Sequence, residues 1–140
     1  MRIILSNTEP TLKNYTWVKD ISSLDKIVDD AEATEILVDN FLSSFNFSFA
    51  GEALKKILSK LRTRGTITIY VKDISLICHN VASLALDISD INSLFFEDSQ
   101  AIASVLNLSN VSDILTQCGL TVKEKHLNVE TCQGIIVAER

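Results

Sequence analysis

The chain has 140 residues, of which 46% are hydrophobic and 22% charged, a balance typical of one globular domain spanning residues 1–140. Its formal net charge of -5 argues against a nucleic-acid backbone as the main partner, because that binding depends on clustered Lys and Arg. No stretch reaches the roughly 20 apolar residues of a membrane span, and no charged-then-apolar signal peptide opens the chain.

The first part of the chain contains four short apolar runs that end in polar residues, as expected of buried parallel strands. We predict strands at 2–6, 16–18, 27–28 and 35–38. The first run passes directly into Ser6-Asn7-Thr8-Glu9-Pro10, a polar turn that contains no glycine. The later runs are closed by Lys19-Asp20, Asp29-Asp30 and Asp39-Asn40. The links between these strands are too short for full crossover helices, so one face of this half of the sheet is expected to lack a covering layer.

A helix is predicted over 50–62, because apolar side chains recur there at helical spacing, at Leu54, Ile57, Leu58 and Leu61. Gly65 is predicted to stop this helix in a left-handed conformation. The run 66–71 is the clearest strand, because it is rich in β-branched residues.

The stretch 75–106 is predicted to be mainly helical but irregular, with caps at Ser89 or Asp90 and at Asp98 or Ser99. A further helix is predicted over 111–118. Asn110 together with Asp113 is expected to cap its start, and Gly119 to end it.

The last two strands are predicted at 121–127 and 134–138, and their short connection indicates an antiparallel hairpin. The element order predicts an α/β, Rossmann-like fold with a mostly parallel sheet and an antiparallel edge. The strand at 66–71 should lie parallel to the one at 35–39, with the helix at 50–62 as a right-handed crossover between them.

Several phrases of the sequence follow the order of a known family. The runs RIILSN and WVKDI are similar to a first strand with its cofactor loop and a second strand with its terminal acid. EILVDNFLSSF and LSKLRTRGTITIYVKDI are similar to a fourth strand and to a helix that enters a fifth strand. NLSNVSDILTQCGLTVKEKHL and GIIVAER complete the pattern. Taken together, they resemble the small class I S-adenosylmethionine-dependent methyltransferases over nearly the whole chain.

The resemblance implies a cofactor site at the first two strands. Ser6, Asn7 and Thr8 match the glycine-rich loop that faces the methionine part of S-adenosylmethionine. Asp20 matches the acid that holds the ribose hydroxyls. The alternative for Asp20 is a carboxylate that ends a strand or caps a turn, since Asp is common in turns.

The same resemblance places Asp29 and Asp30 near the adenine, although a solvated loop is the alternative for this pair. Asp39 and Asn40 match positions beside the transferable methyl group, and Asp39 is the one residue we name as a catalytic base. Open α/β sheets bind ligands at the carboxyl ends of their strands, which agrees with this placement.

A few other side chains have plainer interpretations. Cys78, Cys118 and Cys132 have no metal-like spacing, so no metal site is expected and the thiols should be reduced, as in the cytoplasm. Trp17, Phe95 and Phe96 are expected in the core, and an exposed one would mark a contact surface. His126 follows Lys123-Glu124-Lys125 and is expected on an exposed edge strand.

Two functions from different classes remain open. The first is a methyltransferase that binds S-adenosylmethionine and acts on a small molecule, a sugar or a protein side chain. The second is a non-catalytic assembly or interaction module that has kept the sheet but lost the cofactor, which the loop without glycine favours.

The sequence also predicts a homodimer. Ile3-Ile4-Leu5 and Ile36-Leu37-Val38 are consecutive apolar residues, so each strand directs large side chains to both faces of the sheet. If the first half has few helices, a second copy related by a two-fold axis is the expected cover.

Overall fold

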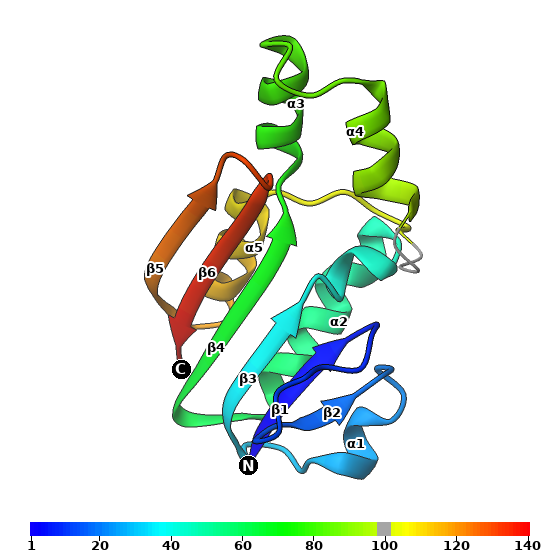
Figure 1. The fold of residues 1–140 in the computed structure, drawn as a ribbon. Helices are drawn as coiled ribbons and strands as arrows, with labels where there is room; N and C mark the ends of the chain where they lie inside the picture. Colours follow the sequence, from blue (N-terminus) through cyan, green and yellow to red (C-terminus); the bar gives the residue numbers. More distant parts are fainter. Residues whose placement is uncertain (98–101) are drawn as a thin grey trace.

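The computed structural model describes residues 1–97 and 102–140 (Figure 1). It contains one sheet with the strand order β2-β1-β3-β4-β6-β5. The strands are β1 (Arg2–Ser6), β2 (Thr16–Val18), β3 (Ala33–Asp39), β4 (Leu61–Lys72), β5 (Thr121–Asn128) and β6 (Gln133–Glu139).

The predicted sheet arrangement is confirmed. Strands β1, β2, β3 and β4 pair in parallel, and Ile36 of β3 lies beside Ile67 of β4. The helix α2 joins these two strands. Strand β6 runs antiparallel to both β4 and β5. The fold is therefore α/β and mostly parallel, with a C-terminal antiparallel hairpin.

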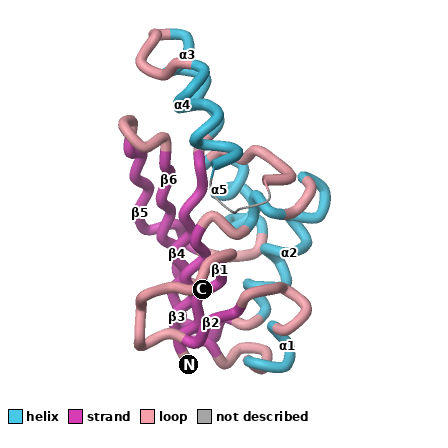
Figure 2. The backbone as a smooth tube through the Cα atoms, turned by 45° about the vertical axis from the view of Figure 1, so that its right-hand side comes forward, coloured by secondary structure: helices cyan, strands magenta, loops and turns pink. Residues whose placement is uncertain are grey.

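The helices are distributed unevenly around the sheet. They are α1 (Leu24–Ile27), α2 (Phe47–Ser59), α3 (Ile74–Ala82), α4 (Ile88–Asn92) and α5 (Leu108–Gln117), with a 3-10 turn at Leu42–Ser44 and a π-helical turn at Ser93–Glu97. Figures 1 and 2 show that α1, α2 and α5 lie on one face of the sheet, whereas α3 and α4 project beyond the carboxyl end of β4. No helix of the described ranges is long and apolar enough to cross a membrane.

The core lies between the sheet and this single helical layer. Side chains from alternate positions of the central strands are fully buried there, among them Ile36, Val38, Ile67 and Ile69. Their sequence neighbours point to the other face, because successive side chains of a strand alternate. Those neighbours, including Leu37 and Thr68, are only half-buried. No helix lies over the β3, β4 and β6 part of this face (Figure 1). The expectation of an uncovered first half is met only in part, because Ile4 of β1, on the same face as Leu37, is 2% exposed.

The predicted strand at 27–28 is wrong. Ile27 is the last residue of α1, and Val28 is extended but pairs with no described strand. Two apolar residues are too few to distinguish a strand from the end of a short helix. The helix forms because Leu24 packs into the core, fully buried.

The helix boundaries shift from those predicted. Helix α2 begins earlier, because the Asn46 side chain accepts a hydrogen bond from Phe49 N and caps it, and Leu61 already belongs to β4. Gly65 does not stop the helix. It lies within β4, and a Cβ there would come within 2.9 Å of the Arg62 carbonyl oxygen, so close packing requires the glycine.

The caps in the later helical region also differ. Asp87 caps α4, and Asp90 is the third residue of the same capping box, so Ser89 and Asp90 are not the N-cap. Asn107, rather than Asn110 with Asp113, caps α5. Gly119 follows the C-cap with φ of 83°, as expected of a helix end. The predicted caps Asp98 and Ser99 lie outside the described residues.

One buried carboxylate joins the end of the parallel sheet to two helices. Asp73 is 4% exposed, and its Oδ1 accepts from Ser75 N and Leu76 N at the start of α3, at 2.9 and 3.1 Å. Its Oδ2 accepts from Leu108 N at the start of α5, at 2.7 Å. A carboxylate suits both helix N-termini, where backbone N–H groups have no partner within the helix.

We expect Asp73→Ala to lower the free energy of unfolding by about 2–4 kcal/mol, because it removes a helix cap and leaves the buried Leu108 N–H without an acceptor. Urea denaturation would measure this loss. Asp113→Ala is the matched control, because Asp113 is an exposed acid on α5, and it should change stability by less than about 0.5 kcal/mol. Equal effects of the two substitutions would contradict the proposed role of Asp73.

Candidate functional site

The carboxyl ends of β1 and β3 lie side by side and form the centre of the candidate site. Ser6 and Asp39, the last residues of these strands, are register partners. Asn7 and Asn40 each follow one of them in the chain. Asn40 has φ of 49°, a left-handed conformation that Asn tolerates better than most residues. The structure thus brings five of the predicted residues, Ser6 to Thr8 with Asp39 and Asn40, to one edge of the sheet.

The loop after β1 folds tightly without glycine. The Ser6 hydroxyl donates to the Thr8 carbonyl oxygen at 2.7 Å, and the Ser6 carbonyl oxygen accepts from Trp17 Nε1 at 3.1 Å. None of residues 6–8 has a positive φ, so the turn needs no glycine for its own conformation.

Three buried polar atoms around this edge have no hydrogen-bond partner within the described chain: Asn7 Nδ2, Asn40 Oδ1 and Ser104 Oγ. Ser104 is connected to Asn40 through Ser43. Ser104 N donates to the Ser43 carbonyl oxygen at 3.1 Å, and the Ser43 hydroxyl donates to the Asn40 carbonyl oxygen at 3.0 Å. Buried polar atoms are nearly always satisfied, so such a group indicates water or a ligand at this place.

Asp20 is held in a turn before α1. Its Oδ1 accepts from Ser22 N at 3.0 Å, from Ser23 N at 3.1 Å and from the Ser22 hydroxyl. The hydrogen bond from the Ser22 hydroxyl is the largest cause of the lowered pKa of Asp20, and desolvation acts in the opposite direction. Turn capping, the alternative considered from the sequence, is therefore present. Ribose binding by Asp20 stays a prediction.

Asp29 and Asp30 are not brought to the same edge. They precede the amino end of β3, whereas Asp39 ends this strand, so they do not lie at the edge where the resemblance implies the cofactor. Asp30 instead forms an ion pair with Lys60 Nζ at 2.6 Å, and Asp25 contacts the same ammonium group at 2.8 Å. The misplacement follows from the incorrect strand at 27–28, which would have ended at these acids.

A shallow hollow of about 370 Å³ lies on the bare face beside the crevice. Its lining comes from β1, β3, β4 and β6 and from the loop between β1 and β2: Ile4, Pro10, Thr11, Leu12, Leu37, Asp39, Tyr70 and Gln133. Asp39 and Tyr70 are register partners, so both side chains face this hollow. Asp39 also accepts a hydrogen bond from Asn40 Nδ2 at 2.9 Å. A catalytic role for Asp39 stays a prediction.

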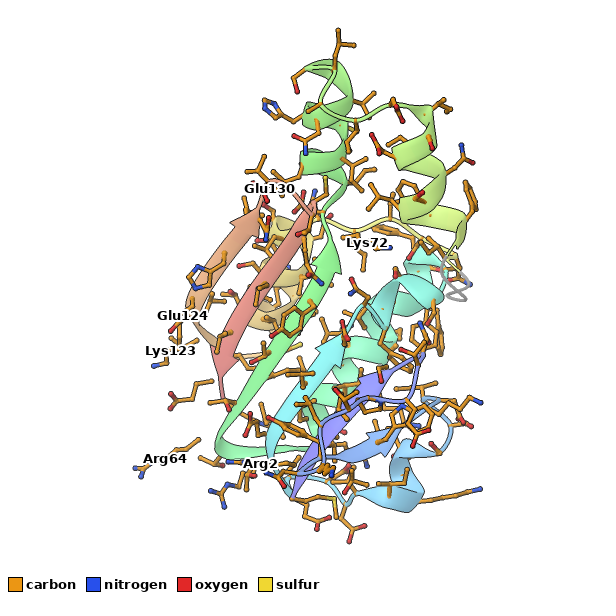
Figure 3. The ribbon with its side chains drawn as sticks, in the orientation of Figure 1. Arg2, Arg64, Lys72, Lys123, Glu124 and Glu130 are labelled. Atoms are coloured by element: carbon orange, nitrogen blue, oxygen red, sulfur yellow. The ribbon has the colours of Figure 1, made fainter. Side chains whose placement is uncertain are left out.

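Charged side chains mark the two ends of the sheet (Figure 3). Lys72 lies at the carboxyl end of β4, and its Nζ donates to the Leu94 carbonyl oxygen at 2.6 Å. Arg2 and Arg64 lie at the opposite end (Figure 3). His126 is exposed on the edge strand β5, as predicted. Within residues 1–97 and 102–140, no group of three His, Cys, Asp or Glu side chains is arranged to hold a metal ion.

The sequence could not reveal Ser104 as part of this edge. It lies more than sixty residues from Ser43 along the chain, in a segment without periodic apolar pattern. The backbone hydrogen bond with Ser43 is what connects it to the segment after β3.

No protein-family model matches the chain, and no curated protein matches its sequence. Solved structures do match it. The 1,6-didemethyltoxoflavin-N1-methyltransferase of Burkholderia thailandensis, with bound 1,6-didemethyltoxoflavin and S-adenosylhomocysteine, is 15% identical with a TM-score of 0.61. The match covers 99% of this chain and 61% of that one.

Two further methyltransferases with bound S-adenosylhomocysteine are similar. The magnesium protoporphyrin IX methyltransferase of Synechocystis is 11% identical, with a TM-score of 0.56 over 90% of this chain and 50% of its own. The N-methyltransferase NodS of Bradyrhizobium japonicum is 15% identical, with a TM-score of 0.56 over 92% of this chain and 56% of its own. The chain therefore has the fold of class I S-adenosylmethionine-dependent methyltransferases and spans half to 61% of the length of these three structures.

Lys60 forms ion pairs with Asp25 and Asp30, and these three residues are here called the Lys60 cluster. The cluster predicts how the stability of the fold depends on pH. Hydrogen bonds from Lys56 and Lys60 lower the pKa of Asp25 from 3.8 to about 2, and Lys60 also lowers the pKa of Asp30. A carboxyl with a lowered pKa stabilises the fold above its unfolded-state pKa, and this stabilisation is lost as the pH falls through the folded-state value. The free energy of unfolding should therefore decrease between about pH 4 and about pH 2.

Lys60→Met should make this decrease shallower, because, among the described residues, Asp25 loses one of its two cationic partners and Asp30 loses its only one. Urea unfolding at a series of pH values would measure the slope. Lys55→Met is the control, since the only ion pair of Lys55 in the described chain is with exposed Glu52. A Lys60→Met slope equal to that of the Lys55→Met control would rule the cluster out as the cause.

Proposed function

We propose that the chain binds S-adenosylmethionine in the crevice at the carboxyl ends of β1 and β3 and acts as a small methyltransferase. The observation that carries this proposal is the set of three buried, unpartnered polar atoms on Asn7, Asn40 and Ser104. Asn7 and Asn40 directly follow the ends of β1 and β3, where open α/β sheets bind their ligands, and Ser104 is joined to Asn40 through Ser43. The acceptor would be a small molecule, a sugar or a protein side chain.

The residues present offer chemistry that suits this cofactor. Asn7 Nδ2 is a donor, which fits the carboxylate of the methionine part, and Asn40 Oδ1 is an acceptor, which fits an amine. Asp20 uses only its Oδ1 in the hydrogen bonds of its turn. Its Oδ2 can therefore accept a hydrogen bond from a ribose hydroxyl.

When bound, the cofactor would supply an electrophilic methyl group on its sulfonium sulfur. The chain's contribution would be to position the acceptor in line with that group. Asp39 faces both the crevice and the hollow on the bare face, so its carboxylate could remove a proton from an acceptor held there. Leu37, Ile4 and Leu12 would provide an apolar floor for such an acceptor.

A second candidate is the non-catalytic interaction module, and specific observations favour it. The loop at residues 6–8 has side chains where a glycine would allow a ligand to approach the backbone. Asp30 is bound to Lys60 at the far end of β3. The bare sheet face offers a surface to a partner.

Calorimetry and thermal unfolding with S-adenosylmethionine and with S-adenosylhomocysteine separate the two candidates. A ligand at about 100 times its dissociation constant stabilises the folded state by about 2.7 kcal/mol. We expect both ligands to bind and to raise the midpoint of thermal unfolding. Absence of heat and of any shift at millimolar ligand would reject cofactor binding and leave the interaction module.

Asp20→Ala should weaken cofactor binding by about 1–3 kcal/mol, the scale for losing a charged hydrogen-bond acceptor. Asp20→Asn keeps an acceptor for the turn and tests the charge without removing the turn itself. Asp29→Ala is the matched control, because Asp29 lies before the amino end of β3, and it should leave the affinity unchanged. Equal calorimetric affinities for the wild type and both Asp20 variants would exclude this carboxylate from the ribose site.

A further inference from the structure

The bare face of the sheet lacks the cover that parallel strands normally have. Parallel sheets are usually packed on both faces. Here β3, β4 and β6 present Leu37, Tyr70, Ile135 and Val137 on the face opposite the helices, and all four are half-buried. Thr68 lies between Leu37 and Val137 in the pairing of these strands. The centre of this face is therefore mainly apolar.

A second surface lacks a partner at the end of the same sheet. Residues 74–97, here called the arm, comprise α3, α4 and the π-helical turn and extend past the carboxyl end of β4 (Figures 1 and 2). Four of its large apolar side chains are strongly exposed: Val81 at 42%, Leu84 at 89%, Ile88 at 77% and Phe96 at 76%. Such a concentration of exposed apolar side chains marks a contact surface.

The arm is fixed in this projecting position. Asn80 is 4% exposed, and its Nδ2 donates to the Val129 carbonyl oxygen in the β5–β6 turn at 2.7 Å. Lys72, at the carboxyl end of β4, donates a hydrogen bond from its Nζ to the Leu94 carbonyl oxygen of the arm. With these anchors, the arm does not fold back onto the bare face of its own sheet.

We propose that two copies of the chain form a two-fold dimer in which the arm of each copy lies across the bare sheet face of the other. Each surface supplies what the other lacks, since the arm is a helical layer without a sheet and the face is a sheet without a helical layer. The two-fold axis would pass near the carboxyl ends of the strands, with the two sheets inverted relative to one another. The assembly stops at two copies, because the one arm and the one bare face of each copy are both occupied in the dimer.

The dimensions agree with this arrangement. Helix α3, with its nine residues, carries the arm about 14 Å beyond the end of β4. The paired part of β4, residues 66–72, is about 23 Å long. The tip of an inverted arm would therefore reach more than half-way along the partner's strands towards their amino end.

The charges agree as well. Residues 80–96 of the arm contain Asp87 and Asp90 and no Lys or Arg. The amino end of the sheet carries Arg2, together with Arg62 and Arg64 at the start of β4, and the latter two are exposed and form no ion pair with any described residue. Inversion would point the acidic arm tip of one copy towards the basic end of the other.

The area needed for a stable dimer explains why the arm must take part. The three strands β3, β4 and β6, about 4.8 Å apart and seven residues long in their paired part, present a face of roughly 330 Å². A stable interface buries about 800 Å² on each partner. A contact of sheet against sheet alone is therefore too small, whereas the exposed apolar side chains of the arm extend it towards the required area.

Sedimentation velocity over a range of concentrations tests the dimer. The wild type should sediment at twice the 15.5 kDa mass of one chain at high micromolar concentration. The arm variant Leu84→Asp with Ile88→Asp, and the face variant Thr68→Lys with Val137→Lys, should each raise the dissociation constant at least tenfold. Leu127→Asp is the matched control, because Leu127 is an exposed apolar residue on β5 whose side chain lies on the opposite face, and it should still dimerise.

An equimolar mixture of the arm variant and the face variant gives the decisive result. A mixed dimer keeps one intact arm–face contact, so the mixture should associate where each variant alone stays monomeric. Thr68→Lys alone provides a milder face variant, and circular dichroism would confirm that each variant is folded. A monomeric wild type, dimerisation of the folded variants at wild-type strength, or a mixture as monomeric as its components would each overturn the proposal.

Discussion

The carboxylate of Asp73 is the contact on which the arrangement at the end of the sheet depends. It receives hydrogen bonds from the first turns of both α3 and α5, while its own backbone N–H donates to the Cys132 carbonyl oxygen at 2.8 Å. One residue thus sets where the arm leaves β4 and where α5 starts to cover the core. It also ties both helices to the β5–β6 turn. These elements are far apart in the sequence, so no local propensity could fix their relation.

The single helical layer determines which face of the sheet is available to ligands and partners. With α1, α2 and α5 on one face, the main core is built from one side of each strand, and the other side of β3, β4 and β6 has no helical cover. The crevice at Ser6 and Asp39 lies at the border of this open side. A ligand in the crevice and a protein on the open face would therefore be neighbours, and Asp39 and Tyr70 would be close to both.

Strong local patterns allowed much of the fold to be predicted. The β-branched run at 66–71 and the final hairpin were identified because their apolar alternation extends over several residues. Ile27 and Val28 were misassigned because two apolar residues do not define a period, and this error carried Asp29 and Asp30 to the wrong end of the sheet. Gly65 was misread because a glycine required by close packing looks the same in sequence as one required by a left-handed turn.

The candidate site was only partly predictable for a related reason. Ser6, Asn7 and Asn40 could be placed because they follow recognisable strands, and the carboxyl ends of parallel strands meet at one edge. The turn that engages Asp20 is local and was foreseen as an alternative. Ser104 depends on a backbone contact between distant segments, which leaves no periodic signal in the chain.

The two edge strands of the sheet, unlike its open face, are unsuited to contact with another chain. Strand β2 has only three residues, and β5 carries Lys123, Glu124 and Lys125 in succession beside a register irregularity between Val122 and Glu124. Short strands, charges and bulges all oppose the addition of a further strand. The molecule is thus protected from growth into extended β-fibrils, even though one face of its sheet carries no helical layer over β3, β4 and β6.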